Sequence, residues 1–105
     1  MNYLRTEFGR LGNEFLIFRV HAVRRMAERG ISEKEIACVM RQGVQIKEYR
    51  DDTPYPSRLV LGWCGSRPLH VVAADDLQTG ATIIITTYEP DPSQWDNTFR
   101  FRRES

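Results

Sequence analysis

The chain has 105 residues, of which 41% are hydrophobic and 28% charged, so it is long enough for one globular domain with a modest core. A formal net charge of +1 excludes the overall basic field of a general nucleic-acid binder. Only two of the 15 basic residues are lysines, Lys34 and Lys47, and the rest are arginines, whose planar guanidinium suits phosphate. A genome rich in G and C explains this preference equally well.

The N-terminal part of the chain has weak periodicity. We predict a loosely ordered extension over residues 1–14, followed by a single domain over residues 15–105. Charged side chains are spread through this part, and its only apolar run, residues 15–18, is too short for a signal peptide or a membrane span. We therefore expect a cytoplasmic protein that does not contact membranes.

Two helices are predicted next. Apolar residues recur at helical spacing over residues 20–29, and Gly30 supplies a C-terminal stop. Ser32 and Glu35 have the spacing of a capping box, which marks the start of a second helix over residues 32–42.

Beyond the helices the hydrophobic pattern changes to the alternation of strands. We predict four strands and a short C-terminal helix, over residues 44–49, 58–64, 69–74, 82–88 and 94–98 respectively. Because the strands follow one another with short connections, we expect an α+β domain in which the two N-terminal helices pack on a four-stranded antiparallel sheet. The other face of this sheet is expected to be open and to carry a site.

The two cysteines are far apart in the sequence. Cys38 and Cys64 lack C-x-x-C spacing, which predicts neither a disulfide scaffold nor a zinc site, and Cys38 is expected to be a small core residue. Pairs of turn aspartates have no spacing typical of a metal loop. We expect no metal and no cofactor.

The first helix carries one candidate acid–base residue. His21 shares a helix face with Arg25, and Arg29 lies one turn further on. Histidine exchanges protons near neutral pH, and arginine stabilises charge on phosphate. The alternative is a histidine that packs at the helix N-terminus beside an arginine row that is simply solvated.

The strands carry a second group of polar candidates. His70 interrupts an apolar strand, where an isolated polar side chain needs a partner. Alternation predicts that Ile84, Thr86 and Tyr88 share one face of the neighbouring strand, beside His70. Arg58 begins another strand and is expected to point toward the open face. Tyr88 is equally well interpreted as a core aromatic with its hydroxyl at the rim.

Several ordered motifs resemble those of an uncharacterised bacterial domain family over residues 18–103. They are HAxxRMxxRGIS from His21, YPSR from Tyr55, RPLHVV from Arg67, IITxYxP from Ile84 and PDPxxW from Pro90. That family is similar to RelE-like and MqsR-like toxins, within the wider group of barnase-type, metal-independent ribonucleases. The resemblance implies a RelE-like fold, RNA as the substrate and a cognate antitoxin that masks the open sheet face.

The resemblance also implies roles for individual residues. The catalytic residues would be His21, Arg25, His70 and Tyr88, and the RNA-binding residues Arg29, Arg58 and Thr86. In the expected transesterification, one histidine removes the proton of the ribose 2′-hydroxyl, the other protonates the leaving 5′-oxygen, and arginines stabilise the phosphorane. The chain departs from RelE-like toxins in having no lysine cluster.

Two other functions fit the same residues. One is a non-catalytic RNA- or protein-binding module on the same fold, in which Tyr55, Trp63 and Trp95 stack on bases or belong to the core. The other is an accessory domain in DNA processing. Convergence of His21 and His70 on one cleft would favour the ribonuclease, whereas their separation would favour a binding module. The sequence predicts no oligomeric state.

Overall fold

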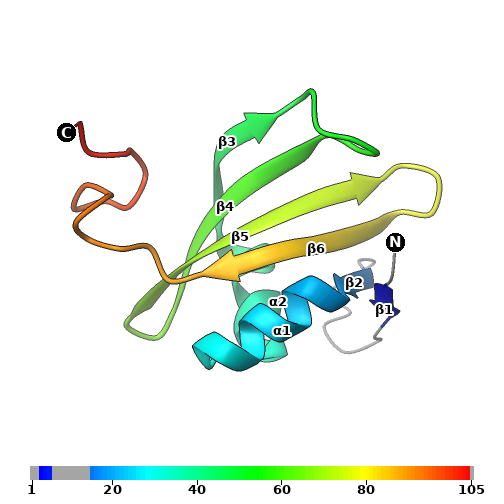
Figure 1. Cartoon of the computed structure of the whole chain (residues 1–105), viewed down its shortest axis with the longest axis horizontal. Coiled ribbons are helices and arrows are strands. Elements are labelled where there is room, and N and C mark those ends of the chain that lie inside the picture. The colour runs from blue at the N-terminus through cyan, green and yellow to red at the C-terminus, as the bar shows by residue number, and fades with distance from the viewer. Residues whose placement is uncertain (1–2, 6–14, 105) are drawn as a thin grey trace.

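The computed structural model describes residues 3–5 and 15–104. It contains two helices and six strands (Figure 1). In chain order they are β1 (Tyr3–Arg5), β2 (Phe15–Arg19), α1 (Val20–Arg29), α2 (Glu33–Gln42), β3 (Val44–Tyr49), β4 (Ser57–Cys64), β5 (Arg67–Asp76) and β6 (Ala81–Tyr88). The two helices and β3 to β6 confirm the elements predicted from periodicity. Of the predicted loose extension, residues 3–5 instead form β1, and residues 1–2 and 6–14 lie outside the described residues.

The sheet has six strands in the order β1-β2-β6-β5-β4-β3. All neighbours are antiparallel except β2 and β6, which are parallel. The expected four-stranded antiparallel sheet is therefore wrong. The apolar run at residues 15–18 is a strand, with Leu16 and Phe18 almost fully buried. β2 leads directly into α1, whose N-cap residue Arg19 makes no side-chain capping bond, so no sequence signal marks this boundary.

The predicted C-terminal helix is also wrong. Residues 90–104, called here the C-terminal segment, form turns and one isolated bridge between Trp95 and Arg102. The carboxylates of Asp91 and Asp96 accept hydrogen bonds from backbone N–H groups two residues further on. Such side-chain bonds compete with the helical ladder and favour turns.

Both helices pack on the same face of the sheet and form the main core with it (Figure 1). The capping box at Ser32 and Glu35 is present as predicted. At Gly62 of β4 an added Cβ would lie 2.9 Å from a methyl group of Val39, so glycine permits the close approach of α2. Buried members of this core are Leu16, Phe18, Ala22, Met26, Ile36, Val39, Val60, Leu69, Val71, Ala73 and Ile84.

A register shift between β5 and β6 changes which side chains share a face. Val72 pairs with Thr86 but Ala73 pairs with Ile84, so β6 holds one extra residue, a β-bulge. Ile84 consequently joins the helix-side core, whereas Thr86 and Tyr88 lie opposite, on the face of His70. The predicted common face of Ile84 with Thr86 and Tyr88 is wrong because strict alternation does not continue through a bulge.

Two further features complete the fold. Cys38 of α2 and Cys64 of β4 form a disulfide with their Cα atoms 6.3 Å apart, contrary to the expectation from their spacing. Folding brings the end of β4 beside α2, which sequence separation does not reveal. Disulfides are rare in the reducing cytosol, so a cytoplasmic location does not follow from the structure.

Across the described residues, no helix combines the length and the apolar character needed to cross a membrane.

Candidate functional site

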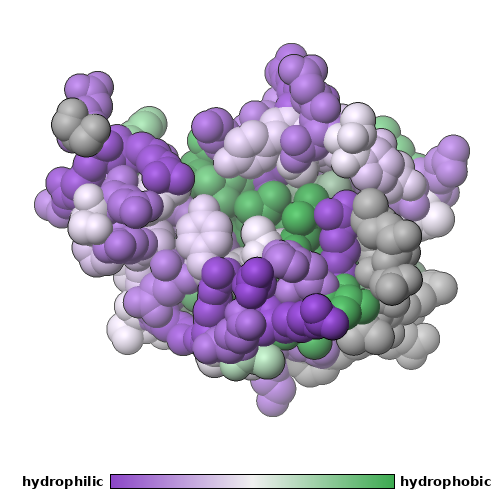
Figure 2. Space-filling view, viewed as in Figure 1, coloured by the Kyte–Doolittle hydropathy of each residue, from purple (hydrophilic) through white to green (hydrophobic). Residues whose placement is uncertain are grey.

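The sheet face opposite the helices, called here the outer face, carries a cleft of about 310 Å³ beneath the C-terminal segment. Figure 2 shows apolar side chains at the bottom of a hollow on this side, with hydrophilic side chains of the C-terminal segment at its left rim. We call this hollow the basic cleft. It is lined by Ile46, Lys47, Tyr49, Leu59, Tyr88, Trp95, Arg100, Phe101 and Arg102.

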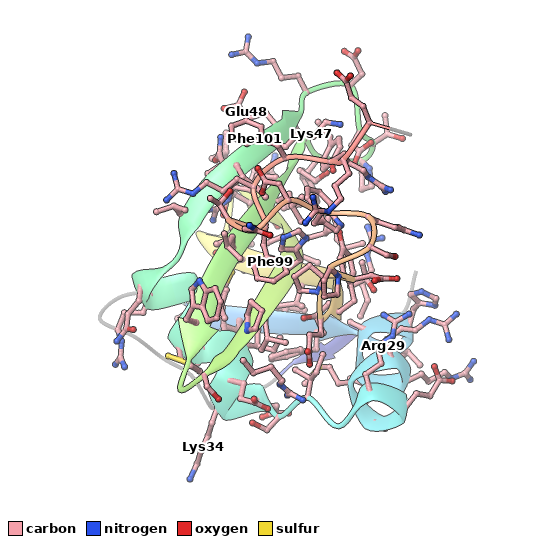
Figure 3. The ribbon with its side chains drawn as sticks, turned by 90° about the vertical axis from the view of Figure 1, so that its left-hand side faces the viewer. Arg29, Lys34, Lys47, Glu48, Phe99 and Phe101 are labelled. Atoms are coloured by element: carbon pink, nitrogen blue, oxygen red, sulfur yellow. A yellow bond between two sulfur atoms is a disulfide. The ribbon has the colours of Figure 1, made fainter. Side chains whose placement is uncertain are left out.

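Strand pairing explains how β3 contributes to the basic cleft. Lys47 lies opposite Leu59, and Tyr49 lies opposite Ser57, which places both side chains on the outer face. A register shift between Gln45 and Lys47 sets this phase. Figure 3 shows Lys47 and Phe101 together over β3, away from Arg29 on α1 and Lys34 on α2.

The cleft has three cations and no carboxylate in its lining: Lys47, Arg100 and Arg102. Within residues 3–5 and 15–104, none of the three forms an ion pair with a carboxylate. Lys47 Nζ lies 5.3 Å from the ring centroid of Tyr49, and Arg102 Cζ lies 5.2 Å from that of Trp95, within range of cation–π attraction. The positive charge of the cleft is thus left available to a ligand.

His70 connects the sheet to the C-terminal segment. Its side chain is 0% exposed, and Nε2 donates a 2.8 Å hydrogen bond to the carbonyl oxygen of Phe99. The ring also packs edge-on against Trp95, with centroids 4.5 Å apart. Burial lowers the pKa of His70. The hydrogen bond to Phe99 raises this pKa in part, and the positive charge of Arg102 lowers it further. The ring is therefore neutral at neutral pH, with its proton on Nε2.

The turn that His70 holds has an unusual backbone. Phe99 has φ of 60°, in the left-handed region, which costs roughly 1–3 kcal/mol for a bulky side chain. Its N–H donates to the carbonyl of Asp96, and its ring packs edge-on against Trp63 at 5.8 Å. These contacts, together with the bond from His70, hold the turn that directs Arg100 and Phe101 over the outer face.

Tyr88 is the second partner of His70. Because Nε2 of His70 carries the proton, Nδ1 accepts, and the Tyr88 hydroxyl donates to it at 3.2 Å. Burial raises the pKa of Tyr88, so its hydroxyl stays protonated at neutral pH. In the cleft this group acts as a hydrogen-bond partner or a proton donor, not as a base.

The structure separates the two histidines. His21 is exposed on α1, in the helix layer, whereas His70 lies on the opposite face of the sheet. Arg25 is bound to Glu28 at 2.7 Å, and Arg29 donates to the carbonyl oxygen of Thr87 at 2.7 Å, also on the helix side. The expected pair of catalytic histidines therefore does not meet in one cleft.

The remaining predicted residues divide between the two faces. Thr86 lies on the outer face with His70 and Tyr88, as expected from pairing. Arg58 shares the helix-side face of β4 with Val60 and forms a 3.1 Å ion pair with Asp75. Of the seven residues given roles from the sequence, only Thr86, His70 and Tyr88 come together.

The sequence analysis missed most residues of the cleft, among them Lys47, Tyr49, Arg100, Phe101 and Arg102. The run Phe99-Arg100-Phe101-Arg102-Arg103 was a usable signal, because interleaved aromatic and basic residues are typical of nucleic-acid-binding surfaces. Within the described ranges, His, Cys, Asp and Glu form no group of three or more that could hold a metal ion.

Comparison with known proteins identifies a family but no function. The model of a family described as "Domain of unknown function (DUF4258)" matches residues 18–89, which include α1, α2 and β3 to β6. No curated protein and no solved structure matches the chain. The C-terminal segment, with Trp95, Arg100 and Arg102 of the cleft, lies beyond the matched residues. Since the match covers most of the sequence, the chain belongs to this uncharacterised family, DUF4258.

Proposed function

We propose that the basic cleft binds single-stranded RNA. The observation that carries this proposal is the combination of three cations without carboxylate partners and an aromatic ring, Phe101, that is 68% exposed. Cations attract the phosphate backbone, and exposed aromatic rings stack on unpaired bases. A charge concentrated in one cleft also fits a chain whose net charge is only +1.

The shape and polar groups of the cleft favour a single strand of RNA. A hollow of about 310 Å³ has room for an unstacked base but not for a duplex. Tyr49 also lines the cleft, and its hydroxyl group offers a partner to a ribose 2′-hydroxyl. This hydroxyl is the group by which proteins distinguish RNA from DNA.

The two lysines of the chain provide a matched test. Lys47 lines the cleft, whereas Lys34 is exposed on α2 in the helix layer. The affinity for a fluorescent oligouridine should fall in Lys47→Gln, with the salt slope of log K reduced by about 1, and should not change in Lys34→Gln. Equal affinities for the two variants, or equal binding of a duplex, would contradict the proposal.

Cleavage of the bound RNA is a second candidate function, favoured by the position of Tyr88. In transesterification the 2′-oxygen bonds to phosphorus and the 5′-oxygen leaves with a proton. The Tyr88 hydroxyl would supply this proton by turning from Nδ1 of His70 to the leaving oxygen, and would regain one from solvent. The lining offers no carboxylate or exposed histidine, so the 2′ proton would pass to solvent. This lack of a base is why binding ranks first. A toxin-type ribonuclease of this kind would be silenced by an antitoxin that covers the basic cleft.

Removal of one oxygen separates binding from cleavage. Tyr88→Phe keeps the ring in place, so RNA affinity should change less than threefold while any 2′,3′-cyclic phosphate product disappears. Cleavage by the unmodified protein should persist in EDTA. Equal cleavage by Tyr88→Phe would contradict the assignment of Tyr88, and loss in EDTA would contradict the metal-independent reaction.

A further inference from the structure

A second hollow lies on the outer face beside the basic cleft. It has a volume of about 240 Å³ and is lined by Gln42, Val44, Leu61, Gly62, Trp63 and Arg100. Arg100 lines both hollows. The second hollow therefore adjoins the basic cleft at Arg100 of the C-terminal segment.

Trp63 gives the second hollow its character. It is 46% exposed although its ring already packs edge-on against Phe99, and Val44 beside it is 44% exposed. A large, half-exposed aromatic ring offers a stacking platform to any base. The amide of Gln42 adds hydrogen-bond donors and an acceptor for the edge of that base.

The two hollows follow one another along β4. Leu59 lies in the basic cleft, and Leu61 and Trp63 lie in the second hollow. Alternate residues of a strand are roughly 7 Å apart, a spacing that successive nucleotides of an extended strand can match. Residues of the C-terminal segment are distributed over the two hollows in a similar way. Phe99 contacts Trp63 of the second hollow, Phe101 lines the basic cleft, and Arg100 lies between these two residues in the sequence.

A hollow on the helix side lacks these properties. It is lined by Gln45, Glu48, Arg50, Pro56, Ser57, Arg58 and Asp75. Arg50 and Arg58 are neutralised there by Glu48 and Asp75. Its cations are thus already paired, and it does not extend the path of a phosphate backbone.

We infer that the second hollow is a base-stacking subsite, so that the outer face binds two successive nucleotides with Arg100 at the phosphate that joins them. This inference rests on the proposed RNA binding. The ligand is then at least a dinucleotide of single-stranded RNA, and Trp63 and Arg100 are residues that contact it.

The test compares two small probes by calorimetric titration, uridine 3′-monophosphate and the dinucleotide UpU. Uridine 3′-monophosphate carries more negative charge than the phosphodiester of UpU, so a gain in affinity for UpU comes from its second nucleoside and not from charge. UpU should bind the unmodified protein roughly 5- to 150-fold more tightly, the range expected for one stacked base. In Trp63→Ala the two probes should bind with equal affinity, whereas Trp63→Phe, which keeps a ring against Phe99, should retain most of the gain. Leu77→Ala, which removes an exposed side chain from the distant β5–β6 turn, is the matched control.

The outcomes separate this inference from the proposed function. If UpU binds Trp63→Ala as tightly as the unmodified protein, or if both probes lose affinity equally, Trp63 is not a subsite, while RNA binding in the basic cleft stands. If the unmodified protein binds neither probe and no oligouridine, the proposed function itself fails and the subsite with it.

Discussion

The two faces of the sheet are closed in different ways. On the helix side, apolar side chains spaced at the periods of helix and strand interlock, and residues such as Phe18 and Ile36 are almost fully buried. On the outer face, an irregular segment is held by a few polar and aromatic contacts centred on His70. The helix side therefore supplies stability, whereas the outer face presents charge in a cleft whose cover depends on one buried histidine.

The largest effect should come from the helix side. Phe18→Ala removes a ring that is 1% exposed, and the transfer and cavity terms together should lower the free energy of unfolding by about 3–5 kcal/mol. Phe101→Ala, on the outer face, should change it by less than about 0.5 kcal/mol. Urea denaturation measures both. Similar losses in the two variants would contradict the assignment of stability to the helix side.

Removal of His70 should act on the cover of the cleft. His70→Ala leaves the Phe99 carbonyl and the Tyr88 hydroxyl without their partner, which should cost about 1–3 kcal/mol. The C-terminal segment should then be cut by trypsin at its arginines faster than in the unmodified protein. His21→Ala, at the other and exposed histidine, should change neither property. An intact segment in His70→Ala would show that His70 does not anchor it.

A smaller effect should appear as a dependence on pH. Because burial lowers the pKa of His70, the folded protein binds this proton less readily than the unfolded chain, whose histidine titrates near 6.5. Stability should be complete above about pH 6.5 and should fall as the pH drops below it toward the lowered pKa.

The control for this pH dependence is His70→Gln. Its side-chain amide can donate to the Phe99 carbonyl but does not titrate, so the slope between pH 5 and 6.5 in urea denaturation should disappear. A slope that persists in His70→Gln would assign the pH dependence to another group.

Local signals in the sequence predicted α1, α2 and β3 to β6, but they missed β1 and β2 and did not show how the elements assemble. The capping box at Ser32 and the alternation in β4 to β6 were sufficient for their positions. The parallel pairing of β2 with β6 and the bulge near Ile85 depend on contacts between distant segments, and they decide which side chains share a face.

The candidate site was predictable only in its buried part. His70 was selected because a polar residue in an apolar strand needs a partner, and Tyr88 because strand alternation predicts its position beside His70. Arg100 and Arg102 were missed because two Asx turns, rather than the expected helix, bring the C-terminal segment back over the sheet. The arginines of α1 attracted attention because they are dense, but one is paired with Glu28 and another with a backbone carbonyl.

The central claim is that the outer face binds RNA through its unpaired cations. The most direct test compares two triple variants that remove the same charge, one from each face. The cleft variant carries Lys47→Gln, Arg100→Gln and Arg102→Gln, and the helix-side variant carries Arg24→Gln, Lys34→Gln and Arg41→Gln, all exposed on α1 and α2. Affinity for a fluorescent oligouridine is measured over a range of salt concentrations. We expect binding to be lost in the cleft variant, whereas the helix-side variant should keep the affinity and salt slope of the unmodified protein. Equal losses in both variants would contradict this claim.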